Sequence, residues 1–139
     1  MTALYTAEAT AWGGREGRVT SSDGRVDLTL SLPKGLGGDD GPGTNPEQLF
    51  ATGYAACFHS ALKAVARREK VDVSGSAVTV RIEIGPDDDG FALAAAIEVE
   101  IEQVDRDVAA RLVEQAHALC PYSRATRGNI VSTATLVAG

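Results

Sequence analysis

The chain has 139 residues, 44% of them hydrophobic and 23% charged, which suits one globular domain spanning residues 1–139. Its net charge of −6 and its 13 scattered lysines and arginines argue against nucleic acid as a partner, because phosphate binding needs clustered positive charge. No apolar run approaches the roughly 20 residues of a membrane helix, and the N-terminus lacks the pattern of a signal peptide. We therefore expect a cytoplasmic protein that binds neither nucleic acid nor membranes.

The N-terminal part predicts three short strands, within residues 4–12, 18–21 and 26–32. Glycines at 13, 14 and 17 mark a tight turn around Arg15, and Asp23-Gly24 is a strong hairpin signal. Alternation in the third strand places four apolar residues on one face: Val26, Leu28, Leu30 and Leu32.

Residues 33–48 are rich in glycine and proline and predict a loop. No Gly-Lys-Ser/Thr follows, so the loop is not expected to bind a nucleotide. Its glycine-rich part, residues 35–43, either covers a site or simply connects two elements, and the sequence leaves both open.

Residues 44–70 predict the longest helix, with Asn45 as a cap, Pro46 in the first turn and Glu47 at the positive end of the helix dipole. Its centre, "LFATGYAACFHSALKAV", is apolar almost all round, so we expect a core helix that is buried on most sides.

The C-terminal half predicts an antiparallel strand pair, an amphipathic helix ending near Cys120, where Pro121 prevents its regular continuation, and a last strand. Strands and helices in this order indicate an α+β fold rather than a parallel sheet. In the second strand of the pair, alternation predicts that six residues point inward: Phe91, Leu93, Ala95, Ile97, Val99 and Ile101.

Two cysteines carry the most reactive chemistry in the sequence. Cys57 lies in the middle of the long helix, and Cys120 lies at the end of the second one. Taken alone, each also fits an inert thiol, because free cysteine is among the most buried residue types. Arg15 between glycines, with Glu47 as a bidentate carboxylate partner, would supply the positive charge that a thiolate needs at neutral pH.

Two other uses of these residues are not expected. A glutaredoxin-type site would place its cysteine at a helix N-terminus, whereas Cys120 closes a helix, where the dipole disfavours a thiolate. A zinc site is disfavoured because Cys57 and His59 point to nearly opposite sides of one helix, and His117 with Cys120 supplies only two ligands.

Three segments together resemble the organic hydroperoxide resistance proteins, which belong to a wider group that includes OsmC. They are "GGREG", "GTNPEQLFATGYAACFHSALK" and "AHALCPYSRATRGNI", and the similarity runs essentially from end to end. The resemblance implies an intertwined homodimer, with antiparallel sheets wrapped around long buried central helices.

The resemblance also implies an enzyme, a thiol peroxidase that reduces alkyl and lipid hydroperoxides without a metal or other bound cofactor. Cys57 matches the cysteine that attacks the peroxide, and Cys120 matches the one that resolves the resulting sulfenic acid into a Cys57–Cys120 disulfide. Arg15 matches the arginine that stabilises the thiolate, and Glu47 matches its partner. Dihydrolipoyl groups on lipoylated proteins are the implied electron donors.

Helix geometry adds an expectation about where Arg15 acts. Glu47 and Cys57 are ten residues apart, roughly 15 Å along a continuous helix, which is far for one arginine to span. Either Gly53 breaks the helix, or Arg15 and Glu47 come from the opposite subunit, which we favour.

Four apolar residues near Cys57 are candidates for an apolar substrate approach: Leu49, Phe50, Tyr54 and Phe58.

Two other classes of function stay open at this point. The protein would be a redox-sensing or ligand-binding module if its cysteines oxidise without turnover, or a structural protein if they are inert. His59-Ser60 departs from the usual family pattern beside Cys57, and the effect of His59 on substrate preference is left open.

Overall fold

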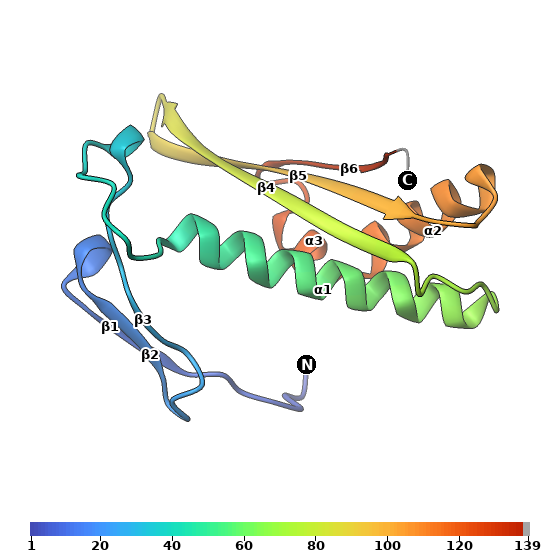
Figure 1. Cartoon of the computed structure of the whole chain (residues 1–139), viewed down its shortest axis with the longest axis horizontal. Helices are drawn as coiled ribbons and strands as arrows, with labels where there is room; N and C mark the ends of the chain where they lie inside the picture. The colour runs from blue at the N-terminus through green and yellow to red at the C-terminus, as the bar shows by residue number, and fades with distance from the viewer. Residues whose placement is uncertain (138–139) are drawn as a thin grey trace. The chain divides into compact units, whose positions relative to one another are not determined.

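The observed order of elements is three short strands, a long helix, a strand hairpin, two further helices and a last strand. The computed structural model describes residues 1–137, and this order confirms the predicted α+β class (Figure 1). The elements are β1 (Ala9–Trp12), η1 (Gly14–Glu16), β2 (Arg18–Ser21), β3 (Asp27–Thr29), η2 (Lys34–Leu36), α1 (Pro46–Arg68), β4 (Ser76–Asp87), β5 (Gly90–Ile101), α2 (Arg106–Leu119), α3 (Pro121–Thr126) and β6 (Val131–Leu136), where η denotes a 3-10 helix.

The chain divides into two compact units, Met1–Leu49 and a second unit that begins at Phe50. Each unit has its own sheet, and α1 starts in the first unit and continues in the second. The description of residues 1–139 as one domain stays a prediction. None of the helices in residues 1–137 combines the length and apolar character needed to cross a bilayer.

In the first unit, β1, β2 and β3 form an antiparallel sheet in that order. The turn between β1 and β2 depends on glycine. Gly13 and Gly14 have φ angles of 77° and 57°, and a Cβ at Gly17 would lie 1.6 Å from the carbonyl oxygen of Trp12. The glycines around Arg15 therefore build the 3-10 turn that carries this side chain.

The sheet of the first unit is largely exposed. Within residues 1–49, all of which the structure describes, Leu30 alone is buried. Val26 and Leu28, on the predicted apolar face, are about two fifths exposed, at 40% and 39%. A small sheet without a packed apolar face is marginal in water, so the first unit needs cover that its own residues do not supply.

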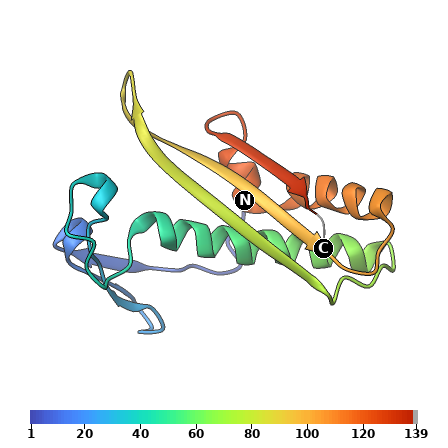
Figure 2. The ribbon, with the colours of Figure 1, turned by 45° about the horizontal axis from the view of Figure 1, so that its top comes forward.

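In the second unit, β4 and β5 form a long antiparallel hairpin and β6 adds to β5 in parallel. Figures 1 and 2 show α2 and α1, from Phe50 onward, on one face of this sheet. The core lies between the sheet and these helices. Its largest fully buried side chains are Tyr54, Phe58, Leu62, Ile97, Leu112, Val99, Cys120 and Ser123.

The predicted inward face of β5 is buried in its C-terminal part but not at Phe91. Ala95, Ile97, Val99 and Ile101 are buried, but Phe91 is 71% exposed. Phe91 pairs with Pro86 at the tip of the hairpin, beyond the part of the sheet that the helices cover (Figure 2). Alternation gives the side of the sheet to which a residue points, but not whether anything packs there.

Helix α1 is buried along one face only. The buried face is Tyr54, Phe58, Ala61, Leu62, Val65 and Ala66. Ala56, Ser60 and Lys63 lie on the exposed side. The expectation of a helix buried on most sides is therefore wrong for a single chain, because within the described part of the second unit the side of α1 that carries Ala56, Ser60 and Lys63 is left exposed.

Two leucines of α2 test which side of that helix stabilises the fold. Leu112 is fully buried, whereas Leu119 is 37% exposed. Leu112→Ala is expected to lower the free energy of unfolding by about 2–5 kcal/mol, through lost burial and the cavity that remains. Leu119→Ala, the matched control on the same helix, is expected to cost clearly less. Denaturant titration of both variants measures the difference, and equal losses would contradict the packing described here.

Candidate active site

The two cysteines meet inside the second unit although they are 63 residues apart in sequence. Both are free thiols, and Cys120 Sγ donates a hydrogen bond to Cys57 Sγ at 3.7 Å. A disulfide needs about 2.05 Å between the sulfurs, so the pair is in contact but not bonded. Cys120 is fully buried, and Cys57 is partly exposed.

Cys120 occupies a corner between two helices. Its backbone N–H donates to Ala116 O and ends α2, and its own conformation is extended, as favoured before a proline. Pro121 then takes the first position of α3, where its missing N–H costs nothing. The end of α2 was predicted, whereas the short helix α3 was not.

The surroundings of Cys57 favour its neutral form. Burial raises the pKa of the Cys57 thiol, and its contact with Cys120 raises it further. A hydrogen bond from the backbone N–H of Tyr122 acts in the other direction and lowers this pKa. No cation is among these influences, although a thiolate at neutral pH needs one nearby.

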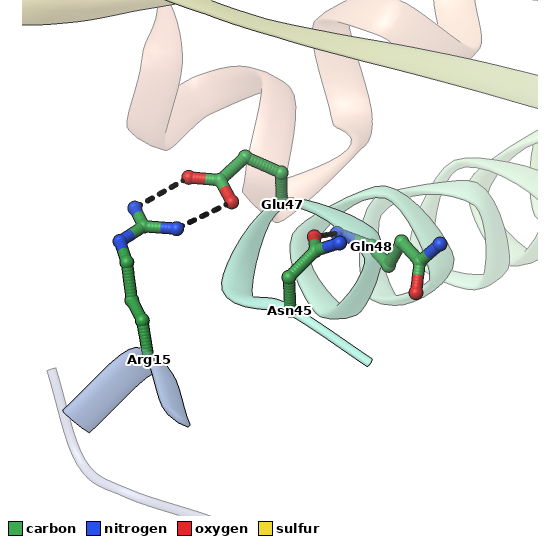
Figure 3. Close-up of polar contacts among 4 residues, drawn as sticks. All are labelled: Arg15, Asn45, Glu47 and Gln48. Carbon is green, nitrogen blue, oxygen red and sulfur yellow. Dashed lines mark hydrogen bonds and ion pairs between the residues drawn. The ribbon is translucent and has the colours of Figure 1, made fainter. Parts of the chain in front are cut away.

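Arg15 and Glu47 form a bidentate ion pair within the first unit (Figure 3). The two guanidinium nitrogens donate to the two carboxylate oxygens at 2.8 and 2.7 Å. The hydrogen bond to Arg15 holds the pKa of the Glu47 carboxyl below its ordinary value, and the same bond raises the pKa of Arg15. This planar pairing fixes the orientation of the guanidinium, which remains 37% exposed.

The start of α1 follows its predicted signals. The Asn45 side chain accepts from the backbone N–H of Gln48 at 2.8 Å (Figure 3), and Pro46 and Glu47 occupy the first turn. The helix then continues without interruption to Arg68. Gly53 therefore does not break it, and the first of the two explanations for the spacing of Glu47 and Cys57 is wrong.

Gly53 instead allows an aromatic side chain to approach α1. A Cβ at this position would lie 3.1 Å from the hydroxyl oxygen of Tyr122. The ring of Tyr122 lies 5.7 Å from that of Tyr54 and 6.1 Å from that of Phe50, so three rings cluster around the glycine. Sequence reasoning missed Tyr122, although its place beside Cys120 and Pro121 was a signal.

The four predicted substrate contacts lie in different surroundings. Tyr54 and Phe58 are fully buried in the core, and Phe50 is partly buried against it. Leu49 is partly buried in the first unit. Substrate contact by these residues stays a prediction, as do the catalytic roles of Cys57, Cys120, Arg15 and Glu47.

A buried polar network beside the cysteines was not foreseen. Ser123 Oγ lies 2.8 Å from Tyr54 Oη and 2.8 Å from His117 Nδ1, and Tyr54 Oη lies 3.2 Å from Ser132 Oγ. Burial lowers the pKa of His117, and the charge of Arg127 lowers it further. Nothing in the spacing of these residues indicates that they meet, because they lie on four different elements.

Both histidines are engaged with serines. His59 Nε2 lies 2.9 Å from Ser76 Oγ, and His117 bonds to Ser123. Among residues 1–137, no three histidine, cysteine or acidic side chains converge in a way that could hold a metal ion.

Comparisons with known proteins agree on one family. The OsmC-like protein family matches residues 37–135. The organic hydroperoxide resistance protein of Xanthomonas axonopodis pv. citri is 51% identical over 134 residues, which cover 96% of this chain and 94% of that protein.

Solved structures agree with this match. The crystal structure of an organic hydroperoxide resistance protein from Elizabethkingia anophelis has a TM-score of 0.94 and 44% identity, with full coverage of both chains. That of the organic hydroperoxide resistance protein OhrB of Bacillus subtilis has a TM-score of 0.88 and 42% identity, and covers 97% of this chain and 100% of that one.

Removing the arginine of the ion pair should change the titration of Glu47. In Arg15→Gln, the pKa of Glu47 is expected to rise toward its ordinary value, as followed by carboxyl-carbon NMR. Because the folded-state pKa is depressed, the pair stabilises the fold above the ordinary glutamate pKa, and this contribution is lost as the pH falls through the depressed value. At neutral pH the variant should lose about 1 kcal/mol or less, since the guanidinium is partly exposed.

Arg25→Gln is the matched control for this titration. Arg25 lies in the same unit, and its side chain is 88% exposed. It should leave the pKa of Glu47 unchanged. A Glu47 pKa that does not move in Arg15→Gln would contradict the electrostatic role of the pair.

Proposed function

Because this chain belongs to the organic hydroperoxide resistance proteins of the OsmC-like family, we propose that it is a cysteine-based peroxidase that reduces organic hydroperoxides to alcohols. The observation that carries this proposal is the unbonded contact of Cys57 and Cys120 at 3.7 Å. Two free thiols at this distance can supply the two electrons that reduce a hydroperoxide, because forming one disulfide from them is a two-electron oxidation.

The first step is a displacement at oxygen. The Cys57 thiolate attacks one oxygen of the hydroperoxide, the O–O bond breaks, and the leaving alkoxide takes up a proton to become the alcohol. Cys57 is thereby oxidised to a sulfenic acid, the first and reversible stage of cysteine oxidation. The partial exposure of Cys57 suits it to meet a substrate, whereas Cys120 has no exposed surface.

The second step removes the sulfenic acid. Cys120 attacks Cys57 Sγ, an S–S bond forms, and the S–O bond breaks. The departing hydroxide leaves as water with the proton of the Cys120 thiol. The sulfurs must approach from 3.7 Å to about 2.05 Å, so a small movement is enough.

An external dithiol completes the cycle. It attacks the disulfide, passes through a mixed disulfide and returns both cysteines to thiols, while it becomes a disulfide itself. We propose a dihydrolipoyl group, carried by a lipoylated protein, as this donor. Neither chemical step calls for a bound cofactor, because the two thiols and the donor carry all the electrons.

Activation of Cys57 needs a positive charge. Burial and Cys120 both raise the pKa of Cys57, so the surroundings within its own unit oppose the thiolate. Arg15 is the proposed source of this charge, with Glu47 to orient its guanidinium. A cation close to the sulfur would favour the anion and lower its pKa.

We propose that Arg15 and Glu47 act on Cys57 of a second subunit. The uninterrupted α1 separates Glu47 from Cys57 by ten residues, roughly 15 Å of helix rise. The exposed sheet of the first unit and the exposed side of α1, with Ala56, Ser60 and Lys63, also favour a homodimer, because each is left uncovered within its own unit and a second subunit would cover it.

The proposed substrates are alkyl and lipid hydroperoxides. Phe50, Tyr54 and Tyr122 form an aromatic cluster in the second unit, and Tyr122 N–H bonds to Cys57. Apolar rings near the reacting sulfur favour an apolar organic group over water or hydrogen peroxide.

Single cysteine variants test the peroxidase. Cys57→Ser is expected to abolish consumption of an alkyl hydroperoxide with dihydrolipoamide as reductant. Cys120→Ser should still oxidise Cys57 once but form no intramolecular disulfide, and Cys57 should accumulate as sulfenic and sulfinic acid. Stopped-flow kinetics and intact-protein mass spectrometry measure both. Turnover that persists in Cys57→Ser would rule out this mechanism, and oxidation of the parent without turnover would favour a redox sensor.

Mixed dimers test the origin of the arginine. Arg15→Gln and Cys57→Ser should each be nearly inactive as homodimers. If Arg15 acts across the interface, a mixed dimer of the two variants contains one complete site, so the mixture should recover up to about half the activity per mixed dimer. Heterodimers with two different affinity tags allow this measurement. Lack of recovery in verified mixed dimers would place Arg15 and Cys57 of one site on the same chain.

A further inference from the structure

The hydrogen-bonded chain through Ser123 joins the elements that hold the two cysteines. It runs from His117 on α2 to Ser123 on α3 and Tyr54 on α1, and then to Ser132 on β6. Tyr54 and Ser123 have no exposed surface. In this dry surrounding, a fully satisfied polar network restrains its members strongly, because a broken bond is not replaced by water.

Members of the network lie close in sequence to both cysteines. Tyr54 precedes Cys57 by three residues on α1, about one helical turn, so the bond from Tyr54 to Ser123 fastens α3 to α1 next to Cys57. His117 and Ser123 lie three residues on either side of Cys120, so their bond closes the corner that carries it. Ser123 is the one residue shared by these two bonds.

Ser123 is the nearest hydroxyl partner of Tyr54 Oη and the residue that links Tyr54 to His117. A serine hydroxyl has one hydrogen to donate, and it bonds to both Tyr54 Oη and His117 Nδ1. Thr126 Oγ1 donates to a backbone carbonyl and lies farther from Tyr54 Oη, at 3.4 Å. Among the described residues, no buried side-chain nitrogen or oxygen lacks a partner, so the network is complete as built.

We propose that Ser123, with Tyr54 and His117, is a positioning residue that holds Cys120 for attack on oxidised Cys57. This inference rests on the peroxidase proposed above and concerns its second step. The sulfurs still have to close from 3.7 Å to bonding distance, and reactions between held groups are sensitive to displacements of this size. Attack on the hydroperoxide uses Cys57 and the incoming substrate, and requires from the corner only the hydrogen bond that Tyr122 N–H donates to Cys57.

Ser123→Ala tests the proposal in a single-turnover experiment. Reduced protein is mixed with an alkyl hydroperoxide, quenched by alkylation at short times and weighed by mass spectrometry, which separates sulfenic acid, disulfide and sulfinic acid. Disulfide formation is expected to slow by about 10-fold or more, since misplacement near 1 Å has cost about 10²-fold in other enzymes. Sulfenic acid formation should stay within about 3-fold, and more Cys57 should reach the sulfinic stage at excess hydroperoxide.

Two further variants keep the test decisive. Ser76→Ala is the matched control, because it removes a serine hydroxyl that bonds to the other histidine, His59, at 2.9 Å; its disulfide should form at the parent rate. Tyr54→Phe removes only the hydroxyl from the same network and should slow disulfide formation in the same direction as Ser123→Ala. Tyr54→Phe replaces Ser123→Ala as the test if Ser123→Ala does not fold, as judged by the lack of a cooperative thermal transition.

The outcomes separate this inference from the proposed function. If the parent forms neither sulfenic acid nor disulfide, the peroxidase proposal itself fails. If the parent turns over and folded Ser123→Ala, or Tyr54→Phe in its place, forms the disulfide at the parent rate, only the positioning role is overturned. Equal slowing of both chemical steps would also overturn it, because that result indicates a general loss of structure.

Discussion

The contact between the two cysteine sulfurs is the constraint on which the second unit is organised. It requires the middle of α1 and the corner between α2 and α3 to meet, although 63 residues separate them. The β4–β5 hairpin and α2 lie between these points in the chain and return it to α1. Pro121 ends one helix and starts the next, and this places Cys120 at a fixed corner rather than on a helix face.

In the proposed mechanism, ionisation of Cys57 and its later attack by Cys120 depend on different parts of the chain. The second unit brings the thiols together but raises the pKa of Cys57, which opposes the anion. The first unit holds an oriented, partly exposed guanidinium on a turn built from glycines. In the proposed dimer, the reactive anion forms only when both parts are present. An isolated, unassembled chain would then carry a less reactive thiol.

Much of the fold was predictable from the sequence because its signals are local. The cap at Asn45, the hairpin at Asp23-Gly24 and the alternation in the C-terminal part of β5 each depend on neighbouring residues, and the structure confirms them. The pairing of Cys57 and Cys120 was implied by the family resemblance rather than by local signals, and the structure brings their sulfurs into contact. Burial was less predictable, as Phe91 and the open face of α1 show, because it depends on what packs there. The Tyr54–Ser123–His117 network was missed because its members meet only in three dimensions.

In the proposed cycle, the unequal burial of the two sulfurs would give the disulfide a preferred direction of opening. A thiol arriving from solvent reaches Cys57 first, since Cys120 has no exposed surface. The donor would therefore become joined to the α1 sulfur, and Cys120 would depart as the leaving group into the protein interior. In that position the Cys120 thiol would attack the mixed disulfide, release a donor that has only one thiol and re-form the Cys57–Cys120 bond. In the proposed cycle, this regioselectivity would favour donors whose second thiol reacts at once over monothiols.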